Sequence, residues 1–578
     1  MDSVTTDAPA SAPAKGRLVM LVDNAIEGDS RVQKAAASAA RAGWDVVVIG
    51  CAPAERRWRV GAAQAMTVQV KPVLRYRPQL RRHPLLRRPL AYRPGPAADY
   101  RRAWIKAKQA GLRVRRAELR AAAPATTSAG AGAAAPAADA YRAAVRRGEL
   151  HVLPRRVVGA VADRWVKLRA RETAAIAEIR KDMDRPLDRI TSRLWRLVLG
   201  RRCWRRLEPG LWDYELAFGK VIDGLRPDLI HAHDYRMLGV GARAKIRAVA
   251  RGRPVRLVWD AHEYLPGLKP PSRATWLPAH CAYELEYSPY ADAVVTVSEP
   301  IAELLRVRHR LPERPSVVLN APPAACAPDA AAPDAADPDP DLDRSPDRLP
   351  GLRERCGIGP GVPLLVYIGG AAEHRGLGVM VQGLARLDGA HLAFVVNTPD
   401  GPYMRSLLDE AGRLGVRDRI HPMPYVPYWH VPEFVSDADV GVIAMDHRQN
   451  HELALPNKFF EYAHGRLPVV VSDVELLART VGEIGQGEVF AVGDVTGFVA
   501  AVRRVLADPE RYRAAYDAPG LLDRWTWEAQ AEVLERIYDR LAPVPADHRP
   551  APELRAASAA GGDRRQRTGV LQAVDERR

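Results

Sequence analysis

The sequence predicts an α/β protein with two doubly wound domains. Apolar runs of strand length alternate with helical patterns, first between Arg17 and Pro322 and again from Val362 onward. Strands that alternate with helices through short connections form parallel sheets with right-handed crossovers. A chain of 578 residues is too long for one hydrophobic core, and its 47% of hydrophobic residues can fill several. We therefore expect two Rossmann-like domains that face each other across a cleft.

The first domain opens with a strand, a helix and a second strand. RLVMLVD at 17–23 is a short apolar run, and WDVVVIG at 44–50 is another. Between them, Ser30 is placed to cap a helix that runs to about Ala42. Further strands are predicted within PDLIHAHD, VRLVWDAHEY, ADAVVTVS and PSVVLNAP, all between Pro227 and Pro322. These segments predict an N-terminal domain at 17–322.

The second domain repeats the pattern from VPLLVYIGG at 362–370. A helix at 376–387 and at least four further strands follow, which indicates another doubly wound sheet. The remaining boundaries follow from composition: a disordered tail at 1–16, an Ala/Pro/Asp linker at 323–361, the C-terminal domain at 362–525, a final helix at 526–542 and a disordered tail at 543–578.

A basic segment at 75–210 interrupts the first domain. Between Arg75 and Arg206 there are 34 Lys and Arg but 10 Asp and Glu, so this segment alone exceeds the chain's net charge of +17. Ala121 to Ala138 is low in complexity, whereas Arg155 to Leu207 has a helical pattern with several tryptophans. Basic helices with tryptophan suit an anionic membrane surface, although a solvated helical excursion would have the same composition. The net positive charge is confined to this segment, and no nucleic-acid recognition motif accompanies it. Nucleic acid is therefore disfavoured as the partner.

The composition also indicates in which cellular compartment the protein is expected. Five cysteines are scattered without a CxxC pair, a pattern typical of reduced thiols and not of disulfides or a zinc site. The first sixteen residues lack the apolar core of a secretory signal, and no apolar run is long enough to span a bilayer. We expect a cytoplasmic protein, with peripheral attachment to the inner face of the membrane through residues 75–206.

Two turns of the second domain are candidate phosphate and ribose sites. In open α/β sheets, ligands bind beyond the carboxyl ends of the strands. YIGGAAEHRG places Gly369 and Gly370 before a helix, with Arg375 as a nearby cation. In LPNKFFEY, Asn457 and Lys458 stand at a helix N-terminus, with Pro456 in its first turn, and Glu461 lies one turn further on the same face. Either pattern alone also fits a tight turn or an amphipathic core helix.

Two turns of the first domain are dense in polar residues. WDAHEY brings His262 directly after a buried strand, where a histidine is either structural or catalytic. HAHD ends a second strand at Asp234. Its HxHD spacing lacks further ligands, and no Cys or His cluster elsewhere in the sequence supplies them. We assign no metal.

The order and spacing of these segments resemble the retaining glycosyltransferases of family 4, which have the GT-B fold. The resemblance rests on DSRVQKAAASAARAGWDVVVIG, PDLIHAHD, WDAHEY, ADAVVTVSE, VVLNAPP, YIGG followed by HRG, ADVGVIAM and LPNKFFEYAHGRLPVVVSD. It implies that Arg375 binds phosphate, that Glu461 holds the ribose and that His262 lies near the transferred sugar. It also implies that Asp29 and Arg31 lie on the loop facing the acceptor, and we add Asp234 to this acceptor side.

Two positions depart from the family pattern. Gly370 stands where many members have an arginine, and Leu453 stands where the first glutamate of a glutamate pair is usual, with Glu452 beside it. The PNKFFEY form resembles a branch of the family without that glutamate. These departures concern contacts to the donor sugar more than the activity.

The resemblance implies transfer of a sugar from a nucleotide diphosphate to a hydroxyl of a glycan or lipid-linked acceptor. This is the chemistry of glycan or glycolipid biosynthesis, and we expect neither a cofactor nor a metal. Two alternatives remain. A nucleotide-sugar epimerase of the same fold would need further acid and base residues. A non-catalytic scaffold would use the basic insertion to bind membrane or nucleic acid. The candidate site residues are all present, which argues against loss of activity: Arg375, Asn457, Lys458, Glu461 and His262.

Overall fold

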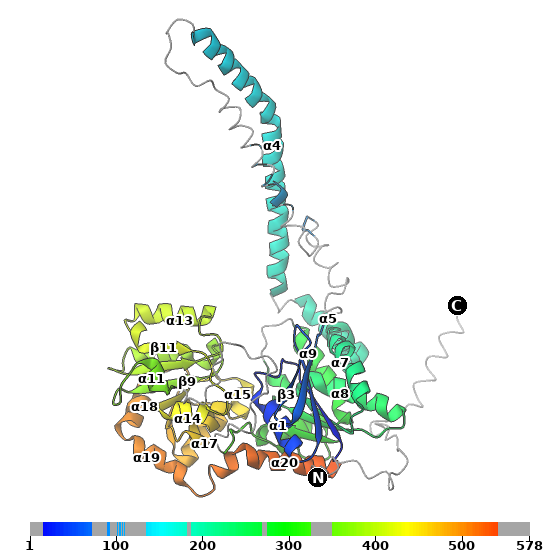
Figure 1. Cartoon of the computed structure of the whole chain (residues 1–578), viewed down its shortest axis with the longest axis vertical. Helices are drawn as coiled ribbons and strands as arrows, with labels where there is room; N and C mark the ends of the chain where they lie inside the picture. Colours follow the sequence, from blue (N-terminus) through cyan, green and yellow to red (C-terminus); the bar gives the residue numbers. More distant parts are fainter. Residues whose placement is uncertain are drawn as a thin grey trace, which may run out of the picture. The chain divides into compact units, whose positions relative to one another are not determined.

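The computed structural model describes residues 15–71, 90–92, 134–181, 186–268, 274–324 and 350–541, with some positions between 101 and 112. The chain divides into two compact units. The first unit comprises Met1–Lys71, Trp195–Pro270 and Leu277–Arg578 and holds both β-sheets (Figure 1). The second unit comprises Pro72–Leu194 and Pro271–Trp276.

The first sheet has eight strands in the order β3-β4-β2-β1-β5-β6-β7-β8. Its neighbours pair in parallel except β3 and β4, which are antiparallel. The strands are β1 Arg17–Leu21, β2 Asp45–Cys51, β3 Arg57–Val60, β4 Ala63–Val68, β5 Leu229–His233, β6 Arg256–Ala261, β7 Ala293–Thr296 and β8 Ser316–Val317. The apolar runs of the sequence thus form the central strands, where both faces are buried.

The sequence patterns did not predict β3 and β4. RWRV and AQAMTV alternate exposed and buried residues, so neither is a continuous apolar run. The first sheet and its helices are here called the first half, and the second sheet and its helices the second half. The helices of the first half are α1 Ser30–Arg41, α6 Trp204–Leu207, α7 Leu211–Leu225, α8 Asp234–Ala250, α9 Trp276–Tyr287 and α10 Glu299–His309. Helix α1 begins at Ser30, but its cap is Asp29, whose carboxylate accepts a hydrogen bond from the Val32 amide. The predicted Ser30 cap was therefore wrong by one residue.

The second sheet has six parallel strands in the order β11-β10-β9-β12-β13-β14. They are β9 Leu364–Ile368, β10 His391–Val395, β11 Ile420–Met423, β12 Val440–Ile443, β13 Val469–Ser472 and β14 Gly487–Phe490. The helices are α11 Leu352–Cys356, α12 Leu377–Leu384, α13 Pro402–Arg413, α14 Val431–Ser436, α15 Gln449–Leu453, α16 Asn457–His464, α17 Glu475–Ile484, α18 Val495–Ala507 and α19 Pro509–Ala514. This arrangement confirms the predicted α/β class with two parallel sheets.

The predicted linker at 323–361 ends earlier than its composition indicated. Helix α11 lies within that range, and Leu352 and Cys356 are buried in the core beneath the second sheet. Residues 325–349, the Ala/Pro/Asp-rich part, lie outside the described residues. The predicted tails 1–16 and 543–578 also lie outside them, apart from Lys15 and Gly16.

The final helix, α20 Trp527–Leu541, packs against the first sheet although it follows the second in the chain. Trp527, Leu534 and Tyr538 are buried with residues of β1, β2 and α1. The Trp527 indole donates a hydrogen bond of 2.8 Å to Ser38 Oγ, and the Trp527 amide donates one of 2.7 Å to the Pro322 carbonyl. The chain therefore passes between the halves twice, once after Pro322 and once before Trp527. The hydrogen bond from the Trp527 amide to the Pro322 carbonyl joins these two passages.

The described part of the second unit is mostly helical. Helix α4 spans Ala134–Lys181, and α5 begins in this unit and spans Pro186–Leu199. The predicted low-complexity segment 121–138 is thus helical from Ala134, and its earlier residues lie outside the described part. None of the helices in the described residues combines the length and apolar composition needed to cross a membrane.

Replacing Trp527 by alanine should destabilise the protein by about 3–5 kcal/mol, because the indole is buried and its loss leaves a cavity. Chemical unfolding monitored by circular dichroism would measure this. Arg536→Ala on the same helix is the control, since that side chain is 68% exposed and its replacement should change little. Equal effects of the two substitutions would contradict a structural role for the α20 packing.

Candidate active site

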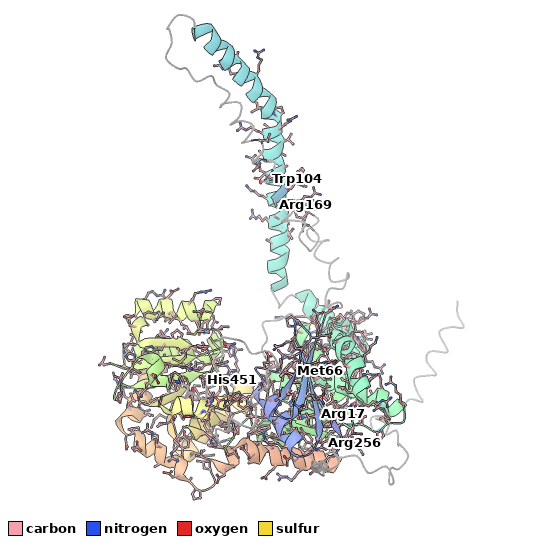
Figure 2. The ribbon with its side chains drawn as sticks, viewed as in Figure 1. Arg17, Met66, Trp104, Arg169, Arg256 and His451 are labelled. Atoms are coloured by element: carbon pink, nitrogen blue, oxygen red, sulfur yellow. The ribbon has the colours of Figure 1, made fainter. Side chains whose placement is uncertain are left out.

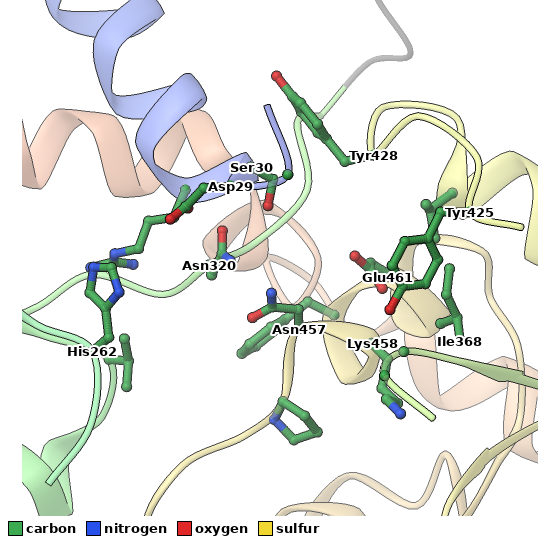
Figure 3. A pocket seen from close by; sticks show the side chains of 18 of the residues that line it. Asp29, Ser30, His262, Asn320, Ile368, Tyr425, Tyr428, Asn457, Lys458 and Glu461 are labelled. Carbon is green, nitrogen blue, oxygen red and sulfur yellow. The ribbon is translucent and has the colours of Figure 1, made fainter. Parts of the chain in front are cut away.

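A cavity of about 1230 Å³ lies where the carboxyl ends of strands from both sheets meet. Its walls are the loops after β1 and β6 on one side and those after β9, β11 and β12 on the other. Figure 3 shows Asp29 and His262 on one side of the cavity and Tyr425, Lys458 and Glu461 on the other. Such a position is the usual ligand site of open α/β sheets.

The cavity brings together most of the site residues predicted from sequence. Those that line it are Asp29, Arg31, His262, Gly369, Gly370, Arg375, Asn457, Lys458 and Glu461. Asp234 does not line it. Residues that the sequence reasoning did not single out also form its walls, among them Asn320, His374, Tyr425, Tyr428, Arg448, Asn450 and His451.

The turn after β9, here called the glycine turn (Gly369–Gly370), depends on the absence of side chains. Gly369 has φ of +141°, and a Cβ added there would lie 2.9 Å from Lys458 Nζ. Glycine leaves this space for the lysine and permits the backbone conformation. The Tyr367 hydroxyl donates a 2.8 Å hydrogen bond to the Gly370 carbonyl, which holds the turn against its own strand.

Lys458 is a buried cation site without a partner. Its side chain is only 6% exposed, and its Nζ has no hydrogen-bond partner among the described residues. The Nζ lies 3.6 Å from the centroid of the Tyr367 ring. Burial lowers the pKa of Lys458 well below its usual value, and neighbouring Arg375 lowers it further. An anionic ligand would supply the acceptors that the ammonium lacks.

Arg375 and Asn457 complete this part of the wall. Arg375 Nη1 donates to Met445 Sδ over 3.2 Å, and the guanidinium has no ion pair in the part of the chain that the structure describes. Asn457 is the first residue of α16 and is exposed to the cavity. Pro456 precedes the helix as its N-cap instead of standing in its first turn.

Glu461 lies one turn into α16, and burial raises the pKa of its carboxyl to about 7, against the influence of Lys34 and Lys458.

Lys34 comes from α1 in the first half, and the sequence analysis did not identify it as a candidate site residue. Its ammonium donates to the Ala321 carbonyl and lies 4.8 Å from the Trp527 ring centroid. Burial lowers the pKa of Lys34 to about 7, partly offset by Glu461. A lysine within the alanine-rich helix α1 was the available signal.

On the first half, His262 belongs to a buried network centred on Asp260. Arg31 donates to both carboxylate oxygens of Asp260 at 2.8 and 2.9 Å, and a third N–H donates to the Val318 carbonyl. His262 Nε2 lies 3.4 Å from Asp260 Oδ2 and 3.3 Å from His233 Nδ1. Burial alone would lower the pKa of His262, but the Asp260 carboxylate outweighs it and raises the pKa to about 9.

The three residues predicted on the acceptor side therefore differ in role. Asp29 lines the cavity while capping α1. Arg31 lines it too, but its guanidinium is occupied by Asp260 and Val318. Asp234 opens α8 with φ of +64°, and its carboxylate accepts a 2.8 Å hydrogen bond from the Tyr235 amide. Burial raises the pKa of Asp234 to about 7.

The HAHD segment gains a third metal-type ligand that the sequence spacing did not reveal. The ligand atoms of His231, His233 and Asp260 lie within 4.8 Å of one another, and all three residues are buried. Both oxygens of Asp260 already accept hydrogen bonds from Arg31, so a divalent cation there would face a guanidinium. The His231 Nδ1 is likewise bonded to the Tyr538 hydroxyl at 2.7 Å. The donor set therefore fits a hydrogen-bond network better than a metal.

Glu452 does not take the place of the missing family glutamate. Its carboxylate accepts a 2.6 Å hydrogen bond from the Glu475 amide, at the start of α17, and lies 2.6 Å from His447 Nδ1. Leu453, at the family position of the glutamate, packs against the hydrophobic core of the first half. Neither residue lines the cavity.

Two protein families match successive parts of the chain. Glycosyltransferase Family 4 matches residues 156–321, and Glycosyl transferases group 1 matches residues 362–508. The first match includes His262, and the second includes the glycine turn, Arg375, Lys458 and Glu461.

Individual relatives are more distant. The 2-deoxystreptamine glucosyltransferase of Streptomyces kanamyceticus is 29% identical over 222 residues, 38% of this chain and 52% of that protein. The 2-deoxystreptamine N-acetyl-D-glucosaminyltransferase of Streptomyces fradiae is 27% identical over 184 residues, 31% of this chain and 42% of that protein. The chain thus matches about half the length of these curated relatives. Sucrose-phosphate synthase of Thermosynechococcus elongatus has the same fold, with a TM-score of 0.53 at 13% identity over 91% of this chain and 99% of that structure.

Because Asp260 holds the His262 pKa at about 9, the imidazolium should persist at neutral pH and stabilise the fold. The unfolded pKa is about 6.5, so this contribution is fully present below that pH and is lost as the pH rises through 9. The difference in unfolding free energy between wild type and His262→Gln should therefore shrink between pH 6.5 and 9. Unfolding curves across this range, with the His262 ring titrated by NMR, would measure it. A ring that titrates at or below 6.5 would contradict the network.

Proposed function

We propose that this chain, which belongs to the GT-B glycosyltransferases through its family 4 and group 1 parts, transfers a sugar from a nucleotide diphosphate to a hydroxyl acceptor. The observation that carries the proposal is the buried, unpartnered Lys458 ammonium at the glycine turn. A diphosphate there would supply the oxygen acceptors that the Lys458 amine lacks, and its negative charge would favour the ammonium form.

The residues of the second half would bind the donor. The N-terminus of α16, with Asn457 and Lys458, favours negative charge through its free amides and helix dipole. Glu461, one turn further, would accept hydrogen bonds from the ribose hydroxyls. Arg375 adds a second cation without an ion-pair partner among the described residues. These charges would stabilise the departing nucleoside diphosphate without a divalent metal.

The residues of the first half would meet the transferred sugar and the acceptor. During transfer, the bond from the sugar C1 to the diphosphate oxygen breaks and a bond from C1 to the acceptor oxygen forms. The acceptor's proton leaves with the diphosphate, and we propose that the product retains the anomeric configuration. His262, held protonated by Asp260, would donate a hydrogen bond to the donor from the opposite wall. Asp29 lines the same wall, where the acceptor would enter.

The names of the two relatives give their transferred groups as glucosyl and N-acetyl-D-glucosaminyl, which supports a hexose-sized donor sugar. We propose a glycan or lipid-linked acceptor and a cytoplasmic site of action. A nucleotide-sugar epimerase is the alternative within the same fold. It would return an isomeric nucleotide sugar, whereas a transferase releases the nucleoside diphosphate.

We further propose that the basic insertion attaches the enzyme to an anionic membrane surface. Along α4, Leu150, Leu153, Val157, Val161, Trp165 and Leu168 are all between 42% and 65% exposed and follow one another at intervals of three or four residues. Such spacing places them along one side of the helix. Trp104 and Arg169, labelled in Figure 2, lie in the same unit, and Trp104 is 46% exposed. The cationic surplus of the segment disfavours self-association and favours anionic lipid.

Lys458→Met should weaken nucleoside diphosphate binding by at least about tenfold while raising the melting temperature of the ligand-free protein. The methionine keeps the apolar stem but removes a buried polar amine that lacks a hydrogen-bond partner among the described residues. Isothermal titration calorimetry with UDP, GDP and dTDP, together with thermal unfolding, would measure both effects.

Lys245→Met is the matched control. Lys245 is also largely buried but forms a 2.5 Å ion pair with Asp292, away from the cavity. Its replacement should lower stability and leave nucleotide affinity unchanged. If Lys458→Met lost stability in the same way and kept its affinity for all three nucleotides, Lys458 would be a structural residue and the donor site would be elsewhere.

Vesicle sedimentation tests the membrane proposal. The protein should bind vesicles with increasing phosphatidylglycerol content, and binding should weaken with salt. The triple variant Val157→Asp, Val161→Asp and Trp165→Asp should lose binding by about tenfold or more, because each change places an acid on the exposed apolar side of α4. Val307→Asp, at a 62% exposed valine of α10, is the control. Binding that ignores lipid charge, or that survives the triple substitution, would contradict the proposal.

A further inference from the structure

The wall of the cavity beside the glycine turn is rich in hydrogen-bond donors and lacks a carboxylate from α15. This wall comes from the segment Arg448–His451 after β12 and from His374 after β9. The rings of His374 and His451 stack with centroids 5.7 Å apart, so the two loops are in contact. The glycine turn and His374 follow the same strand, which places this wall next to the proposed diphosphate site.

Two side chains of this wall have unused donors. Arg448 lines the cavity, and no ion pair or hydrogen bond of its guanidinium is found within the described ranges. Asn450 uses its Oδ1 to accept a 3.0 Å hydrogen bond from the Tyr264 amide, which fixes the orientation of the amide group. Its Nδ2 is buried and has no partner in the described part of the protein. Arg448 and Asn450 therefore offer N–H groups to a ligand in the cavity.

Arg448 has no ion pair on this wall among the described residues, although the Asp446 carboxylate lies close enough to act on His374. Burial lowers the pKa of His374 to about 4, and the positive charges of Arg448 and Arg375 contribute in the same direction. Of the two acids nearest to Arg448 in sequence, Asp446 forms no ion pair with it among the described residues, and Glu452 is directed to the Glu475 amide and His447. A neutral sugar would leave the Arg448 charge buried beneath it without a counterion, which is unfavourable.

We propose that the donor sugar carries a carboxylate, so that the substrate is a nucleotide-linked hexuronate whose carboxylate is bound by Arg448 and Asn450. The inference rests on the proposed function and extends it to the class of sugar. The diphosphate has its own cations in Lys458 and Arg375, which leaves Arg448 for a further anionic group. A carboxylate only accepts hydrogen bonds and matches a guanidinium and an amide N–H in geometry and charge.

Calorimetry with matched donor pairs tests this proposal in the absence of any acceptor. The pairs are UDP-glucuronate with UDP-glucose and GDP-mannuronate with GDP-mannose, and UDP and GDP alone serve as references. For the nucleotide that binds, the hexuronate should bind at least about tenfold more tightly than the neutral hexose. Arg448→Gln should remove this preference while the affinity for the nucleoside diphosphate alone stays unchanged. Arg479→Gln, at an exposed arginine of α17, should behave as wild type.

The outcomes separate this inference from the function on which it rests. If no nucleoside diphosphate binds, the proposed function itself fails. If the nucleotide binds but the neutral donor binds as tightly as the hexuronate, the enzyme is a transferase of neutral sugars and the inference is wrong. If Arg448→Gln weakens the hexuronate and the neutral donor equally, Arg448 acts on the diphosphate or the fold, which also overturns the inference. Retained affinity for the nucleoside diphosphate shows that the variant is folded.

Discussion

The buried ammonium of Lys458 is the constraint around which the second half of the cavity is arranged. The ammonium has no partner among the described residues, and the glycine turn has no side chain at the point where the ammonium lies. An arginine is usual in the family directly after the first glycine of this turn, and here that position is Gly370. Lys458 brings a cation to the same turn from α16 instead. The cost of burying this charge is understandable if a ligand provides the counterion.

The first half differs from the second because the buried charges of Arg31 and Asp260 are already paired with each other. Arg31 and Asp260 form a buried bidentate pair, and the three histidines around Asp260 are positioned by it and by Tyr538 of α20. The last helix of the chain thus supports the polar network beneath His262. Lys34 connects this half to the other, since it donates to Ala321 at one passage between the halves and lies over Trp527 at the other. The positive charge of Lys34 also acts on the carboxyl of Glu461 in the cavity wall.

Local patterns were sufficient to predict the buried strands and the two-sheet architecture, and most of the site residues that they indicated line the cavity. Apolar runs such as RLVML report burial directly, and the turns after such strands meet at one edge of each sheet. Partners across the fold could not be predicted in this way. The apolar side of α20 does not reveal which sheet it covers, and nothing near Arg31 indicates that Asp260, 229 residues later, occupies its guanidinium. Glu452 and Asn450 stand two residues apart in one short helix, yet only the structure shows that one faces α17 and the other the cavity.

We propose that this cavity transfers a sugar from a nucleotide diphosphate by means of its own cations. The most direct measurement is the release of nucleoside diphosphate from a panel of nucleotide sugars by the purified full-length chain, with and without hydroxyl acceptors, in the presence of EDTA. We expect release of one nucleoside diphosphate under these conditions and its loss in the Lys458→Met variant. Release that requires added magnesium or manganese, or that is unaffected by Lys458→Met, would contradict it.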